Sequence, residues 1–214
     1  MMKNTIIYLF SFLLLHLHLS NAILPPSTAD KSYTTTTHPP QNGNIEFIKT
    51  SCQKTLYPDI CFNSLSSYAK KINQDPSKLA IVAIGVSLSK AKKMANYVSN
   101  VSRQADYGAE PRIAAALHDC FSVFGDAVER MHDSLKQMSQ ITGSSSESIR
   151  FQMSNVQTWM SAAMTNEDTC TDGLSDVPNG PVKDDVISRV DKAMHVTSNA
   201  LALINSFVEK VTTP

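Results

Sequence analysis

Long stretches of this chain contain no proline, and this distribution constrains the fold more than any other feature of the sequence. From residue 76 onward, prolines occur only at positions 76, 111, 178, 181 and 214. Proline is tolerated in loops and in the first turn of a helix but breaks a helix interior, so the long spans between these positions can be helical. With only 7 Gly and 7% aromatic residues, a β-sandwich with many tight turns is disfavoured. We therefore expect an all-α fold.

Within these spans, apolar residues recur at steps of three and four, which is the spacing of a helix that buries one face. Four such stripes follow one another, and only short breaks separate them. Short connections make neighbouring helices antiparallel, so we expect an up-down-up-down four-helix bundle over residues 76–214. The stripes are Ile81, Ile84, Leu88, Ala91, Ala95 and Val98; Ile113, Leu117, Cys120, Phe124, Ala127, Met131, Leu135 and Met138; Ile149, Met153, Val156, Met160 and Ala163; and Val186, Val190, Ala193, Thr197, Ala200, Ile204, Phe207 and Val211.

A break rich in small residues separates the second stripe from the third. Gly143 and the serines that follow it end one helix and offer N-caps for the next. Glu147 stands three residues after Ser144, which is the spacing of a capping box, where each side chain binds the other residue's backbone N–H. We therefore expect Ser144 to cap the third helix of the bundle.

The N-terminal segment has the pattern of a secretory signal peptide. Lys3 precedes a mostly apolar run from Ile6 to Leu19, and small residues suited to cleavage end at Ala22. A membrane anchor is the alternative, but a span requires about 20 apolar residues and this run is shorter. Residues 1–22 are therefore interpreted as a signal peptide of a secreted protein. Residues 23–44 are rich in Pro and Thr and poor in apolar side chains, which predicts a flexible leader.

The charges of the chain balance, with 19 Lys and Arg against 19 Asp and Glu. Removal of residues 1–22 takes away Lys3 and no acidic residue, which leaves 18 positive against 19 negative side chains and a net charge of −1. The chain lacks the basic excess that makes a nucleic acid the default partner. Any electrostatic function must therefore be local.

Four cysteines, at positions 52, 61, 120 and 170, allow three pairings into two disulfides. Cys52 and Cys61 enclose eight residues with a reversal at Tyr57-Pro58-Asp59, so they are the local choice and would staple a helical hairpin over residues 45–75. In an antiparallel bundle, the start of the second helix lies beside the end of the third, which brings Cys120 next to Cys170. A zinc site is the alternative, but the spacing does not fit a compact knuckle and no His lies near.

Several segments of the sequence resemble the plant invertase and pectin methylesterase inhibitor family, and the resemblance runs from about residue 45 to the C-terminus. It rests on four cysteines in matching context and on short motifs around them. The motifs are Phe47-Ile48-Lys49-Thr50-Ser51-Cys52, Thr55-Leu56-Tyr57-Pro58-Asp59-Ile60-Cys61, Ala116-Leu117-His118-Asp119-Cys120, Asp126-Ala127-Val128, Trp159-Met160-Ser161-Ala162-Ala163-Met164-Thr165 and Asp168-Thr169-Cys170. The resemblance implies a four-helix bundle with an N-terminal hairpin, disulfides 52–61 and 120–170, and an inhibitor in the apoplast or cell wall, over residues 45–214.

The resemblance also implies a partner-binding surface. Ser122, Asp126, Glu129 and Asp133 share one polar helix face by their spacing, and an ordinary solvated face is the plain alternative. In family members directed at pectin methylesterase, polar and acidic residues of the second and third bundle helices bind across the substrate cleft of the enzyme. Matching on the cysteines assigns this role to Asp126, Glu129, Thr169 and Asp172.

Three hypotheses for the target follow. Invertase-directed members resemble one another in a Pro-Lys-Phe segment, whereas the loop here reads Pro181-Val182-Lys183-Asp184 and has no aromatic residue after the lysine. We therefore expect pectin methylesterase as the target, in a one-to-one complex with a monomer, and keep acid invertase as the alternative. The third hypothesis is a module that binds a wall polysaccharide without inhibiting an enzyme, but a single Trp offers little for a stacking platform.

We expect no catalytic activity, because the sequence contains no nucleophile elbow, phosphate loop or zinc-binding His pair. We also expect that the protein binds no cofactor or metal. The run His118-Asp119-Cys120 does not predict a thiol nucleophile, since neighbouring helix residues point in different directions and Cys120 is assigned to a disulfide. Asn100-Val101-Ser102 is the one sequon, so Asn100 is a candidate glycosylation site.

Overall fold

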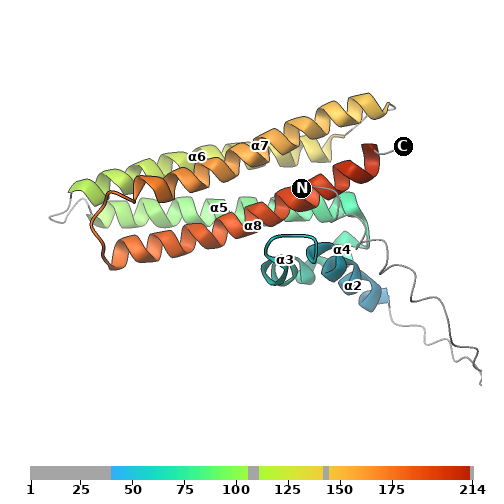
Figure 1. Ribbon diagram of the computed structural model, residues 1–214, viewed down its shortest axis with the longest axis horizontal. Helices are drawn as coiled ribbons and strands as arrows, with labels where there is room; N and C mark the ends of the chain where they lie inside the picture. Colours follow the sequence, from blue (N-terminus) through green and yellow to red (C-terminus); the bar gives the residue numbers. More distant parts are fainter. Residues whose placement is uncertain (1–39, 106–110, 142–144, 213–214) are drawn as a thin grey trace, which may run out of the picture. The chain divides into compact units, whose positions relative to one another are not determined.

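The structure is a computed structural model that describes residues 40–105, 111–141 and 145–212, all within a unit that spans residues 38–214 (Figure 1). The interpretations of residues 1–22 as a signal peptide and of residues 23–39 as a leader lie outside the described residues. The bundle helices are α5 (Pro76–Ala105), α6 (Pro111–Ser139), α7 (Ser146–Gly173) and α8 (Pro181–Thr212). They are preceded by α2 (Pro40–Cys52), α3 (Pro58–Leu65), the 3-10 turn η1 (Ser66–Tyr68) and α4 (Ala69–Ile72).

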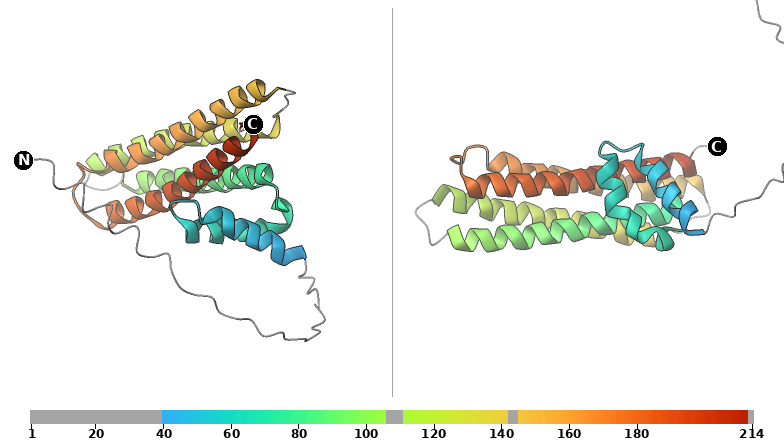
Figure 2. Two further views of the ribbon diagram at one scale, coloured as in Figure 1. Left: turned by 45° about the vertical axis from the view of Figure 1, so that its right-hand side comes forward. Right: turned by 90° about the horizontal axis from the view of Figure 1, so that it is seen from below.

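The expected up-down-up-down four-helix bundle is confirmed. Each long helix packs against its two neighbours, so that α5 contacts α6, α6 contacts α7, α7 contacts α8 and α8 closes on α5 (Figures 1 and 2). Three of the helices begin at the prolines that the sequence pointed to, at residues 76, 111 and 181. The predicted stripes form the core, and Phe124, Met131, Met153 and Met160 are fully buried. No strand occurs in the part of the chain that the structure describes, and no helix there is long and apolar enough to cross a membrane.

The cap of α7 differs from the prediction by one residue. Ser145 is the N-cap, with an extended backbone and a side chain that accepts a hydrogen bond from the Ser148 backbone N–H at 3.2 Å. Ser144, which we expected to cap the helix together with Glu147, lies outside the described residues. Consecutive serines offer equivalent cap side chains, so the spacing to Glu147 could not decide between them.

The N-terminal hairpin begins earlier than predicted. Helix α2 starts at Pro40, five residues before the expected boundary at 45, so residues 40–44 are helical and do not belong to a flexible leader. Asn44 explains the difference, because it is buried and its Oδ1 accepts a hydrogen bond of 3.2 Å from Gln74 Nε2. This tertiary contact joins the start of the hairpin to its end and supports a helical turn that composition alone disfavours.

Both expected disulfides are present. Cys52 and Cys61 have their Cα atoms 5.5 Å apart and close the hairpin. Cys120 and Cys170 have their Cα atoms 4.5 Å apart and join α6 to α7. Because all four cysteines are in disulfides, no thiolate remains for the zinc site that was the alternative.

The hairpin is attached to the α5 and α8 side of the bundle (Figure 2). The backbone N–H of Tyr57 donates to Asn199 Oδ1 at 3.1 Å, and Asn199 Nδ2 donates back to the Tyr57 carbonyl oxygen at 2.9 Å. The Tyr57 ring also stacks on His195 of α8, with the ring centres 3.8 Å apart. The outer faces of α6 and α7 are therefore left uncovered by the hairpin.

A glutamate lies in the core between α7 and α8. The Glu167 side chain is fully buried, its Oε1 accepts a hydrogen bond of 3.1 Å from Thr197 Oγ1, and its Oε2 has no partner among the described residues. Burial disfavours the carboxylate and raises the pKa of Glu167 to about 8, although the bond from Thr197 acts in the opposite direction. Glu167 is therefore protonated in the folded protein over the acidic and neutral range.

We predict that this carboxyl makes the fold less stable as the pH rises. Its folded pKa of about 8 lies above its ordinary value of 4.5, so its contribution is complete below 4.5 and is lost as the pH rises toward 8. Between about pH 5 and about pH 7.5, the free energy of unfolding should fall by on the order of 3 kcal/mol from this group. Glu167→Gln cannot ionise and should remove that part of the slope, measured by chemical denaturation across this range.

The control for this prediction is Glu147→Gln, because Glu147 is an exposed glutamate of the same helix. It should leave the pH dependence of the wild type unchanged. Parallel stability curves for the wild type and Glu167→Gln would show that Glu167 does not control the pH dependence.

The two disulfides should differ in how much they stabilise the fold. Cys120 and Cys170 are separated by 50 residues, and Cys52 and Cys61 by 9. In the chain-entropy account these loops correspond to about 4 and about 2.5 kcal/mol. Because all four sulfurs are equally buried, replacing either pair with alanine leaves comparable cavities. Denaturation of the two double variants should show the greater loss for the 120–170 pair, and an equal or greater loss for the hairpin pair would contradict it.

Candidate functional site

The four residues assigned to a binding surface all have exposed side chains on two neighbouring helices. Asp126 and Glu129 lie on α6, and Thr169 and Asp172 lie on α7. Because a helix turns by about 100° per residue, Asp126 points about 160° away from buried Phe124. The same spacing separates Asp172 from buried Leu174. These side chains therefore point away from the core, on the uncovered outer side of the α6·α7 pair.

The disulfide between α6 and α7 determines how these residues are spaced along the bundle. Cys120 and Cys170 stand opposite each other, and the helices run in opposite directions. With a rise of about 1.5 Å per residue, Asp126 lies about 9 Å beyond this link, and Thr169 lies about 1.5 Å beyond it in the same direction. Asp126 and Thr169 are therefore within about 8 Å of each other along the axis, whereas Glu129 and Asp172 are about 16 Å apart.

The charge of this surface is lower than the sequence pattern predicted. Arg130, which is half-buried beside the acidic face of α6, has a terminal nitrogen 3.6 Å from a Glu129 oxygen and another 3.8 Å from an Asp133 oxygen. Glu129 is thus partly neutralised. Within the described residues, Asp126 and Asp172 form no ion pair. The spacing rule that grouped the acids did not consider the arginine between them.

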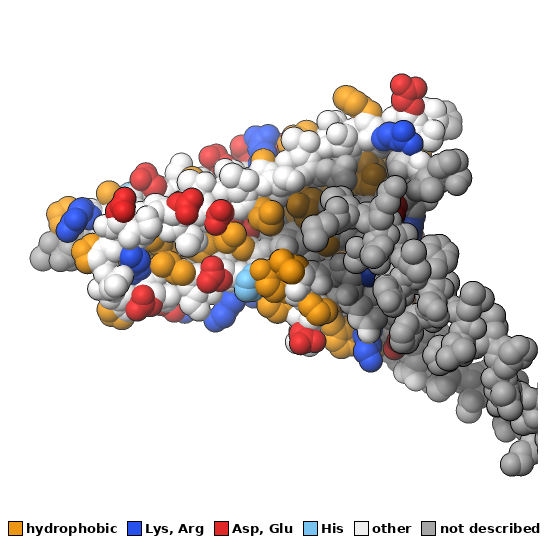
Figure 3. Space-filling model, in the orientation of Figure 1, with side chains coloured by type: hydrophobic (Ala, Val, Ile, Leu, Met, Phe, Trp, Pro, Cys, Tyr) orange, Lys and Arg blue, Asp and Glu red, His pale blue; other side chains and the backbone are white. Residues whose placement is uncertain are grey.

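Thr169 presents an acceptor to solvent. Its hydroxyl donates to the Thr165 carbonyl oxygen at 2.8 Å, so the hydrogen is occupied and the oxygen lone pairs remain available. The ionised carboxylate of Asp126 likewise offers only hydrogen-bond acceptors, because it has no hydrogen to donate. A partner that binds this surface must therefore supply hydrogen-bond donors or positive charge. Exposed acidic side chains are also frequent over the ends of α7 and α8 that adjoin residues 174–180 (Figure 3).

The loop between α7 and α8 is held by Lys183. The Lys183 side chain is buried, and its Nζ donates to the carbonyl oxygens of Ser175 at 3.0 Å and Val177 at 2.7 Å. Sequence reasoning singled out this lysine only for the missing aromatic residue after it. A cation in the first turn of a helix interacts unfavourably with the helix dipole. The position of Lys183 in the sequence could therefore have indicated a structural role.

The other residues that the sequence raised take no part in this surface. His118 and Asp119 are exposed, and Cys120 is in a disulfide, so the thiol-nucleophile alternative has no structural basis. Asn100 is exposed on α5, where its Oδ1 accepts a hydrogen bond from Arg103, and its glycosylation stays a prediction. No group of acidic, His or Cys side chains among the described residues could hold a metal ion.

Comparisons with known proteins agree on one family. The family model described as plant invertase/pectin methylesterase inhibitor matches residues 46–203. Pectinesterase inhibitor 10 of Arabidopsis thaliana is 44% identical over 164 residues, which are 77% of this chain and 52% of that protein. This chain thus spans about half the length of that relative. Pectinesterase inhibitor 11 of Arabidopsis thaliana is 38% identical over 213 residues, which cover 98% of this chain and 100% of that protein.

A solved structure has a similar fold. A mutant form of a pectin methylesterase inhibitor from Arabidopsis superimposes with a TM-score of 0.58 at 19% sequence identity. The superposition covers 74% of this chain and 95% of that one. At this identity the likeness concerns the fold alone.

Proposed function

Because the chain belongs to the plant invertase/pectin methylesterase inhibitor family, we propose that it is a secreted inhibitor of plant pectin methylesterase. In this proposal it acts in the apoplast or cell wall, has no catalytic activity of its own, and limits the de-esterification of pectin. The names of its relatives support the choice of target, since two of them are called pectinesterase inhibitors.

The inhibitor is proposed to block the substrate cleft of the enzyme with the outer face of α6 and α7. Asp126 and Thr169 support this proposal, because both are exposed on one side of a helix pair that a disulfide holds in register. Both present acceptors, so they pair with donors of the enzyme rather than with its catalytic carboxylates. A rigid helix pair loses little conformational entropy on binding, which favours occlusion by a preformed surface.

Acid invertase is the alternative target, and the α7–α8 loop disfavours it. Lys183 is buried and bonded to two carbonyl oxygens of that loop, so it is not free to enter a partner's binding site. Its exposed neighbours in the chain are Val182 and Asp184, and no aromatic side chain follows the lysine. We also propose that the protein is a monomer that forms a one-to-one complex with its target. Asn100 is proposed to carry a glycan that stays clear of α6 and α7.

The first expected outcome concerns the target. The mature protein should inhibit a plant pectin methylesterase and leave acid invertase active, because the loop lacks an accessible lysine and an aromatic residue. Ester hydrolysis and sucrose hydrolysis are measured with the same protein preparation, and light scattering after chromatography gives the stoichiometry. Strong inhibition of invertase with none of the esterase would establish the alternative instead.

The second expected outcome concerns the surface. Asp126→Ala and Thr169→Ala should each weaken binding to the esterase by about 1–3 kcal/mol if the side chain meets a buried donor. Alanine is a good helix former and both residues lie off the core, so the thermal stability should hold. Calorimetric titration measures the affinity. Asp191→Ala is the matched control, since Asp191 is an exposed aspartate of α8, outside the α6·α7 pair. Wild-type affinity in both surface variants would place the inhibitory surface elsewhere.

A further inference from the structure

A basic groove lies between α5 and α8, on a different pair of helices from the proposed inhibitory face. Its volume is about 280 Å³, and four cations line it: Lys90 and Lys93 from α5, and Arg189 and Lys192 from α8. Asp185 is the one acidic side chain among the lining residues. The groove thus carries a formal charge of +3, although the charges of the whole chain sum to zero.

One end of the groove is organised around Asp185. Arg189 Nε donates to Asp185 Oδ2 at 2.8 Å, the Tyr97 hydroxyl donates to the same oxygen, and the guanidinium lies 4.3 Å from the centre of the Tyr97 ring. These contacts orient the arginine. The hydrogen bond to Asp185 uses Nε of Arg189, and the terminal nitrogens of a guanidinium are the edge that can bind a carboxylate with two bonds.

The positive charge of the groove persists over the acidic and neutral range. The hydrogen bond from Arg189, followed by that from Tyr97, lowers the pKa of the Asp185 carboxyl. Burial and the hydrogen bond to Asp185 raise the pKa of Tyr97. Asp185 therefore contributes one negative charge, Tyr97 stays neutral, and the four cations remain in excess.

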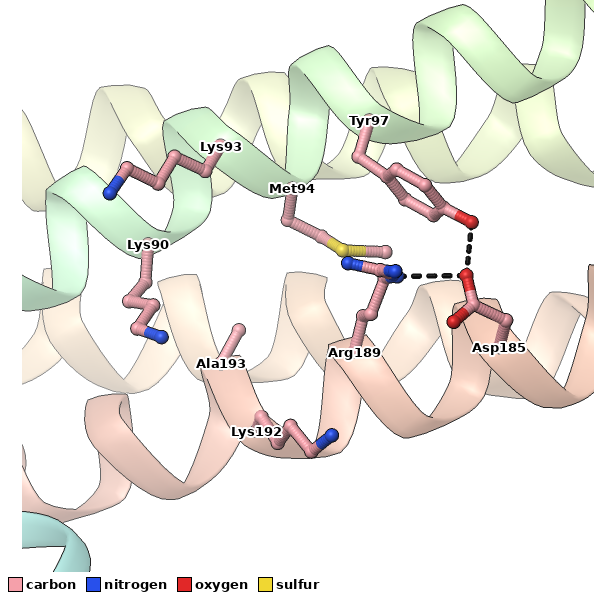
Figure 4. Close-up of a pocket in the computed structure, with 8 residues that line it drawn as sticks. All are labelled: Lys90, Lys93, Met94, Tyr97, Asp185, Arg189, Lys192 and Ala193. Carbon is pink, nitrogen blue, oxygen red and sulfur yellow. Dashed lines mark hydrogen bonds and ion pairs between the residues drawn. The ribbon is translucent and has the colours of Figure 1, made fainter.

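The other end of the groove carries two of its three lysines. Figure 4 shows Lys90 and Lys93 on α5 at the end away from Asp185. Buried Met94 and Ala193 contribute apolar surface to the groove. A second hollow of about 360 Å³ shares Lys93 with the groove and adds Lys92. Lys92 therefore adds one more positive charge on α5 next to the groove.

We propose that this groove binds a polysaccharide whose sugar residues carry free carboxylates, such as the de-esterified pectin that the target enzyme produces. Repeated carboxylates match the lysines that both helices supply, and the guanidinium of Arg189 matches a single carboxylate. Charge replaces the exposed aromatic platform that a neutral sugar would need. The choice of pectin rests on the proposed function, and the groove would anchor the inhibitor to the wall.

The test measures binding apart from inhibition. Calorimetric titration of the mature protein at low salt uses an oligomer of galacturonic acid and its fully methyl-esterified counterpart. We expect binding of the acidic oligomer only, and weaker binding as salt is added. Lys90→Gln/Lys93→Gln should weaken binding about tenfold. The control Lys54→Gln/Lys70→Gln removes two exposed lysines that lie outside both the groove and the α6·α7 face, and it should leave binding unchanged.

Three outcomes would overturn the proposal: no binding of the acidic oligomer, equal binding of its methyl ester, or an equal loss in both pairs of lysine variants. Inhibition of pectin methylesterase is measured in parallel on a soluble short substrate, and both lysine variants should inhibit like the wild type. Failure of the wild type to inhibit would refute the proposed function, whereas failure to bind the oligomer refutes only the role of the groove.

Discussion

The disulfide between Cys120 and Cys170 is the constraint on which the proposed binding surface depends. Side-chain packing allows two antiparallel helices to slide in steps of a turn, about 5.4 Å, at modest cost. A covalent link with Cα atoms 4.5 Å apart removes this freedom at one level. Asp126 lies less than two turns from that level, and Thr169 is adjacent to it. The two side chains can therefore meet a rigid partner without rearrangement, which would not hold for residues at the far end of α7.

The two proposed surfaces use different helix pairs and opposite charges. The α6·α7 face offers hydrogen-bond acceptors. The α5·α8 groove offers cations, and it lies on the side of the bundle to which the hairpin is attached. A protein bound to one surface need not displace a polymer from the other. When enzyme and polymer are held together in the wall, a weak contact of the inhibitor with the polymer raises its effective concentration near the enzyme. The near-zero net charge of the chain is then the sum of positive and negative side chains that lie on different surfaces.

Most of the fold could be predicted from the sequence, because proline positions and apolar spacing are local signals that the bundle obeys. What escaped prediction depends on contacts between distant residues. The early start of α2 needs Gln74 to meet Asn44 across 30 residues. The pairing of Arg130 with its acidic neighbours could have been anticipated from helix spacing, but the α5·α8 groove could not, since its cations come from segments about 100 residues apart. Residue roles at the surface came from resemblance, since exposed side chains leave no periodic signal.

Two buried ionisable groups show how the protein satisfies charge away from water. Lys183, in the first turn of α8, donates from its ammonium group to two carbonyl acceptors of the α7–α8 loop, and these bonds compensate for its burial. Glu167 has one hydroxyl partner for two oxygens, which is too little for a carboxylate, and its pKa rises to about 8. The core therefore tolerates Glu167 only as the neutral acid. A cell wall in the acidic to neutral range keeps it in that form, so the compartment proposed for the inhibitor is also the one in which its core is most stable.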